Sequence, residues 1–176
     1  TQYRRMLGLY AFFYGTLHLF VWMGLDKQFF MAELWADILK RWFITVGMAA
    51  LLIMLIGGRI IPSFTRNWLV RRGPGRLPVS FNRFDIAVMA ASALALVAWV
   101  LFPEARATAA MAVVAGLLNG ARLVRWAGNR TFAEPLVVIL HVAYAFVPTG
   151  FLLLSLGIWR PDIVLPAGAV HAWTAG

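Results

Sequence analysis

The sequence predicts an all-α protein, a polytopic membrane helix bundle with five full transmembrane helices plus a truncated sixth. Two observations support this prediction. Hydrophobic residues make up 62% of the 176 positions and charged residues only 13%, which is far from the composition of a soluble globular domain. The apolar residues also gather into runs close to the roughly 20 residues that an α-helix needs to cross a bilayer. Such segments must be helical, because lipid offers no partner for free backbone groups.

The spans follow one another along the chain. The fourth is the shortest, and it extends to Trp126 if its arginines reach the interface. An apolar segment that starts at Val164 is too short to cross a bilayer, and it predicts the truncated sixth helix. Short connectors with Pro, Gly or Asn separate the later spans, which predicts antiparallel neighbours in a bundle. The five full spans are expected at residues 6–24, 42–61, 84–102, 107–121 and 136–159.

Residues 26–41 join the first two spans and are neither spanning nor plainly polar. Phe29, Phe30 and Leu34 recur near helical spacing, while charged residues take other positions. This pattern predicts a short amphipathic helix at the outer interface. It either covers the bundle or docks a partner.

Basic residues set the expected orientation. The chain has 16 Lys and Arg against 7 Asp and Glu, but they lie between apolar runs, which argues against a nucleic-acid partner. Eleven of them fall on the side of the N-terminus and the 62–82 loop, and five on the other. This bias predicts that the N-terminus and that loop are cytoplasmic. The lipid bilayer is the expected partner, with anionic head groups near the arginines of residues 71–76.

Three histidines are the candidate cofactor and metal ligands. The chain has no cysteine, which excludes disulfides, thiolate-bound zinc and iron–sulfur clusters. His18, His141 and His171 all lie inside apolar runs, where an ionisable side chain is costly and usually has a partner. Neutral imidazole is an axial ligand for haem iron. The alternative is a hydrogen bond to a neighbouring helix.

Depth along the helices favours one pair of histidines. His18 and His171 each lie about 10 Å inward from the outer ends of their runs, by helical rise. His141 lies about 10 Å inward from the cytoplasmic end of its own run. A haem held by two histidines therefore pairs His18 with His171.

A GxxxG motif at Gly116 and Gly120 predicts close packing of both glycines against another helix. Such motifs are common in membrane helices and indicate packing, not function.

The first third resembles the MsrQ family, the haem-binding membrane subunit of the bacterial methionine sulfoxide reductase system. The resemblance rests on RRMLGLY at 4–10, YGTLHL at 14–19, DILKR at 37–41 and ITVG at 44–47. It implies that His18 is a haem ligand.

From Gly57 onward the chain resembles the NnrS family, polytopic bacterial membrane proteins that bind haem and copper and are linked to nitric oxide metabolism. The resemblance rests on GGRIIPSFTRN at 57–67, Glu134-Pro135-Leu136 with His141, and His171-Ala172. Two segments are therefore expected, an MsrQ-like one at 1–56 and an NnrS-like one at 57–176, joined as a chimera or fusion.

These resemblances imply a bacterial inner-membrane protein that holds haem b, with copper as a further metal. The leading hypothesis is an NnrS-like role in nitric oxide metabolism or stress. The first alternative is an MsrQ-like subunit that passes electrons to a periplasmic reductase as its redox partner. A bundle without cofactor is the third hypothesis.

Overall fold

The computed structural model describes Tyr14, Leu17 and residues 42–164 and 166–175. The predicted first span except Tyr14 and Leu17, the 26–41 segment and His18 lie outside the described residues. The chain divides into two compact units, Thr1–Thr45 and Val46–Gly176, and the description below concerns the second. In the described part of this unit every regular element is a helix, and four helices are long and apolar enough to cross a membrane.

Three of these four helices begin and end within a few residues of the predicted spans. They are α4 (Arg83–Leu101), α5 (Arg106–Val124) and α6 (Pro135–Trp159). The start of α4 is fixed by a capping box, in which the Asn82 side chain accepts from the Phe84 amide and Asp85 accepts from the Asn82 amide. Pro135 opens α6 at a position where a missing N–H costs nothing.

The remaining helix, α3, corresponds to the predicted second span at 42–61 and is longer than predicted. It spans Trp42–Val70 and runs through Pro62, where the sequence analysis ended the span, so the expected 62–82 loop shortens to residues 71–82. Proline removes only its own N–H from the helical ladder, and membrane helices tolerate it. The missing N–H leaves the Gly58 carbonyl, four residues earlier, without its usual helical donor. The Thr65 hydroxyl donates to a different carbonyl, that of Ile61, at 2.8 Å.

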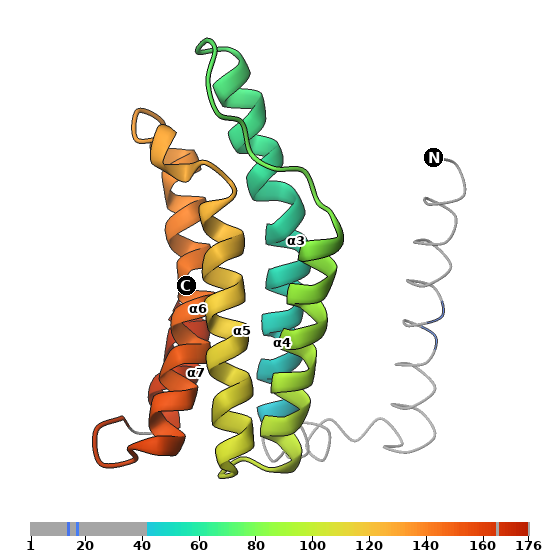
Figure 1. Ribbon diagram of the computed structural model, residues 1–176, viewed down its shortest axis with the longest axis vertical. Coiled ribbons are helices and arrows are strands. Elements are labelled where there is room, and N and C mark those ends of the chain that lie inside the picture. The colour runs from blue at the N-terminus through green and yellow to red at the C-terminus, as the bar shows by residue number, and fades with distance from the viewer. Residues whose placement is uncertain (1–13, 15–16, 18–41, 165, 176) are drawn as a thin grey trace. The chain divides into compact units, whose positions relative to one another are not determined.

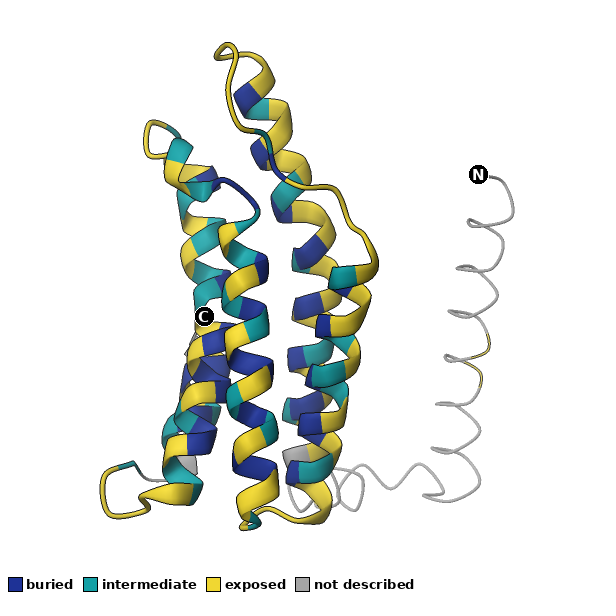
Figure 2. Cartoon of the chain, in the orientation of Figure 1, coloured by how far each residue is buried: buried dark blue, intermediate teal, exposed yellow. Residues whose placement is uncertain are grey.

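The helices pack side by side, as Figure 1 shows. Helix α5 contacts α4 on one side and α6 on the other, and α6 also packs against α7 (Pro166–Ala175). Buried residues follow the inward faces of the helices in Figure 2. Many outward apolar side chains are well exposed, including Leu94, Leu117 and Ile139 at about 60%. An exposed apolar surface of this kind is what a bilayer covers.

The ten residues of α7 correspond to the predicted sixth helix, and they are too few to span a bilayer. One side chain fixes α7 to α6. The Trp173 indole donates to the Val147 carbonyl at 3.2 Å, and its ring meets the edges of Trp99 and Phe151.

The GxxxG prediction is half right. A Cβ on Gly116 would lie 3.0 Å from the Leu152 side chain and 3.2 Å from the Pro148 carbonyl, so Gly116 packs directly against α6. A Cβ on Gly120 would meet no atom of the described residues within 4 Å. The spacing identified a small-residue stripe, but only one of its two glycines lies at the close approach.

This difference gives a matched pair of variants. Gly116→Leu is expected to destabilise the protein by about 1–3 kcal/mol, because the added carbons would push into α6. Gly120→Leu should be neutral or stabilise the protein by up to about 1 kcal/mol, because leucine is the better helix former and meets no neighbour there. Thermal unfolding in detergent measures both. Equal destabilisation by the two variants would contradict the packing described above.

Candidate functional site

A fully buried arginine, Arg122, lies near the end of α5, between α3, α4 and α6. The sequence analysis expected the arginines near the end of the fourth span to reach the interface, but Arg122 has no solvent-exposed surface. Its Nε donates to Asp85 Oδ1 at 2.8 Å, and its Nη1 donates to the Met54 carbonyl and to the Tyr144 hydroxyl, both at 3.1 Å. One side chain on α5 thus holds α3, α4 and α6 together.

The hydrogen bonds continue deeper into the bundle. The Tyr144 hydroxyl donates to Asn119 Oδ1 at 2.9 Å, and Asn119 Nδ2 donates to the Ser92 hydroxyl at 2.8 Å. All of these residues are buried. Asp85, Ser92, Asn119, Arg122 and Tyr144 are called the arginine network below. Buried polar groups of this kind hold a unique arrangement only while every partner is present.

One nitrogen of the guanidinium has no hydrogen-bond acceptor within the described residues. This is Nη2 of Arg122, which is buried. The rings of Trp126 and Phe81 lie 5.5 and 5.9 Å from the guanidinium carbon, so their negative faces offset part of the missing interaction. Nη2 lies against Gly58 of α3, where any Cβ would overlap it.

Local sequence patterns did not reveal the network, although one signal was present. Asp85 is an acid at the edge of a predicted span, and a charge at membrane depth usually has a partner. Arg122 was instead counted among the basic residues that set orientation. Its burial depends on an aspartate 37 positions earlier in the chain, which local patterns do not identify.

The second feature is His141, a half-buried residue on α6. Its Nδ1 lies 2.8 Å from the Val137 carbonyl, a distance that requires a proton on Nδ1. Its Nε2 lies 3.5 Å from the Thr65 hydroxyl, which already donates to Ile61. The neutral imidazole therefore keeps a lone pair on Nε2 that no donor among the described residues uses.

The His141 ring is held by close neighbours. The Trp126 ring packs edge to face against it, with the ring centroids 6.5 Å apart. Trp126 packs in the same way against Tyr144, with the centroids 4.6 Å apart. Gly128 lies so close that a Cβ there would come within about 3 Å of three ring atoms. Trp126 thus lies between His141 and the arginine network.

The structure does not bring the two described histidines together. His171 is exposed on α7, which runs antiparallel to α6 (Figure 1). By helical rise the two residues lie roughly 20 Å apart along the bundle. No group of three or more His, Asp or Glu side chains that could hold a metal occurs within the described residues. The pairing of His18 with His171, and the copper site, stay predictions.

Comparison with known proteins supports both family resemblances. The NnrS protein family matches residues 2–176, on both sides of position 57. The chain is also 41% identical over 123 residues to the protein-methionine-sulfoxide reductase heme-binding subunit MsrQ of Rhodospirillum rubrum, which covers 69% of this chain and 56% of that protein. The MsrQ subunit of Ralstonia nicotianae is 48% identical over 73 residues, or 42% of this chain and 32% of that protein.

A third relative has the same name. The MsrQ subunit of Xanthomonas oryzae pv. oryzae is 34% identical over 123 residues, covering 69% of this chain and 53% of that protein. The chain thus spans about half the length of the longer-matching relatives. No solved structure matches. Neither comparison locates a boundary, so the division into 1–56 and 57–176 stays a prediction. Because the family match covers almost every residue, the chain belongs to the NnrS family.

Proposed function

We propose that this chain is a membrane haem protein that transfers electrons, with His141 as an iron ligand. The relatives named above are heme-binding subunits of a reductase, which favours the electron-transfer hypothesis over the nitric oxide role placed first in the sequence analysis. Membership of the NnrS family keeps nitric oxide chemistry as the second candidate.

The observation that carries the proposal is the hydrogen bonding of the two ring nitrogens of His141. A ligating histidine commonly donates its other ring N–H to a backbone carbonyl, which fixes the tautomer and raises the basicity of the ligating nitrogen. His141 has this arrangement, with Nδ1 on the Val137 carbonyl and Nε2 without a donor.

The residues around His141 hold its ring in one orientation, as an iron ligand requires. Trp126 and Gly128 limit rotation of the ring. The Thr65 hydroxyl donates its hydrogen bond to the Ile61 carbonyl and so does not donate to Nε2 of His141. A bound haem b would supply a one-electron carrier, while the chain orients the imidazole through the Val137 carbonyl and Trp126. Copper is a further candidate metal, implied only by the family.

We place the protein in the bacterial inner membrane with the N-terminus and residues 71–82 in the cytoplasm. The distribution of basic residues supports this orientation. A reductase on the periplasmic side would be the redox partner.

The absorption spectrum of the purified chain tests the proposal. The wild-type protein is expected to show a Soret band, and His141→Ala should lose most of it or become high-spin. His171→Ala makes the same change at an exposed position and should leave the spectrum unaltered.

Two outcomes would contradict the proposal. If His141→Ala keeps a low-spin spectrum while His18→Ala and His171→Ala lose it, the iron is held by the pair that the sequence predicted. A folded but colourless wild-type protein after haem reconstitution would favour the bundle without cofactor.

A further inference from the structure

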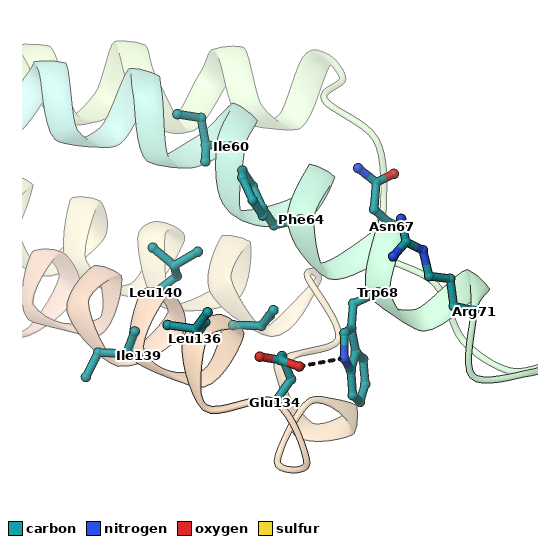
Figure 3. Close-up of a pocket in the computed structure, with 10 residues that line it drawn as sticks. Ile60, Phe64, Asn67, Trp68, Arg71, Glu134, Leu136, Ile139 and Leu140 are labelled. Atoms are coloured by element: carbon teal, nitrogen blue, oxygen red, sulfur yellow. Dashed lines mark hydrogen bonds between the residues drawn. The ribbon is translucent and has the colours of Figure 1, made fainter.

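An open groove lies between the C-terminal part of α3 and the N-terminal part of α6 (Figure 3). It has a volume of about 610 Å³. Its walls are apolar, and several of their side chains are largely exposed, including Phe64 at 57% and Leu136 at 74%. The apolar lining residues are Ile60, Phe64, Leu136, Val137, Ile139 and Leu140.

One end of the groove is polar. Asn67 lies in the last turn of α3 and Arg71 directly follows the end of that helix, and both side chains line the groove (Figure 3). Neither side chain makes a hydrogen bond or ion pair to another described residue. Beside them the Trp68 indole donates to Glu134 Oε2 at 3.1 Å, and Arg72 lies 4.9 Å above the Trp68 ring.

This arrangement matches an amphipathic anion. An arginine binds a phosphate through two parallel N–H donors, and a basic side chain at the end of a membrane helix attracts anionic lipid head groups. The apolar walls run from that polar end along the membrane-spanning parts of α3 and α6. A ligand that uses the whole groove therefore needs a negative head group and a hydrocarbon chain.

We propose that this groove binds an anionic glycerophospholipid, with its phosphate at Arg71 and Asn67 and one acyl chain along Phe64, Leu136 and Leu140. A zwitterionic lipid would bring a cationic group toward Arg71 and Arg72, which repel it. The Glu134 carboxylate would repel the phosphate, but it accepts from Trp68 and forms no ion pair with Arg71. The proposal is independent of haem, because His141 does not line the groove.

Native mass spectrometry of the full chain in detergent, with equal amounts of phosphatidylglycerol and phosphatidylethanolamine added, tests the proposal. The wild-type protein is expected to retain phosphatidylglycerol preferentially. Arg71→Gln should reduce that retention about tenfold, as expected for the loss of a charge-assisted hydrogen bond. Arg66→Gln makes the same charge change on α3 away from the groove lining, and it should retain the lipid.

A second variant tests the apolar wall. Leu140→Trp leaves Arg71 in place but puts a bulky ring in the path of the acyl chain, so it should also lose most of the lipid while keeping the wild-type unfolding temperature. Equal losses from Arg66→Gln and Arg71→Gln would show general charge attraction and overturn the proposal. So would retention of the lipid by Leu140→Trp. If Arg71→Gln loses the Soret band as well as the lipid, the groove holds the haem and the assignment to a lipid is wrong.

Discussion

Asp85→Asn is expected to destabilise the protein by about 3–5 kcal/mol, the usual cost of breaking a buried ion pair from one side. Arg122 has no exposed surface and cannot reach water, so the substitution leaves its charge buried without a counter-ion. The side-chain oxygen of an asparagine at position 85 can still accept the hydrogen bond from the Asn82 backbone N–H at the start of α4, so the helix cap is kept. Unfolding by denaturant in detergent measures the change.

An exposed ion pair in the same chain supplies the control. Arg160 and Asp162 form a two-bond pair at 2.8 and 3.0 Å after the end of α6, and Arg160 lowers the pKa of the Asp162 carboxyl through these hydrogen bonds. Both side chains are more than half exposed. Water screens an exposed pair and leaves it little net effect on stability, so Asp162→Asn should change the unfolding free energy far less than Asp85→Asn.

A double variant separates the two possible sources of the loss. Asp85→Leu combined with Arg122→Leu removes both charges, and it is expected to recover much of the stability that Asp85→Asn loses. A double variant as unstable as the single one would show that losing the Arg122 bonds to Tyr144 and Met54, together with the Asp85 bond to the Asn82 amide, costs as much as leaving the charge unpaired.

The sequence predicted the described spans well because the bilayer fixes how long an apolar run must be. It misplaced the end of α3, since a rule for soluble helices made Pro62 a stop, whereas a membrane helix tolerates proline in its interior. It was half right on Gly116 and Gly120, because a spacing of four does not show where the neighbouring helix comes closest.

The candidate site was predicted only in part. His141 could be picked out as an ionisable residue in an apolar run, but its tautomer depends on a 2.8 Å contact that only coordinates show. The arginine network depends on residues from three helices meeting at one level. Composition and spacing cannot establish that Asp85 and Arg122 share a level, because this depends on how far each helix is shifted along its neighbour.

Gly58→Ala is the second large effect expected from the network. In a helix interior this change ordinarily stabilises by about 1 kcal/mol, because alanine is the better helix former. At Gly58 the new methyl group would overlap the guanidinium of Arg122. A flexible arginine could move aside elsewhere, but this one is held by Asp85, Met54 and Tyr144. We therefore expect a loss of about 1–3 kcal/mol, as in other overpacked cores.

Two comparisons assign that loss to the contact with Arg122. Gly47→Ala, on the same helix, places its methyl group 3.9 Å from Leu96, an ordinary contact, and should be neutral or slightly stabilising. In the Asp85→Leu/Arg122→Leu background the guanidinium is absent, so Gly58→Ala should lose its cost, and the difference between the two backgrounds is the coupling energy. If Gly58→Ala costs the same in both, its effect comes from α3 itself, and Arg122 does not depend on the missing side chain.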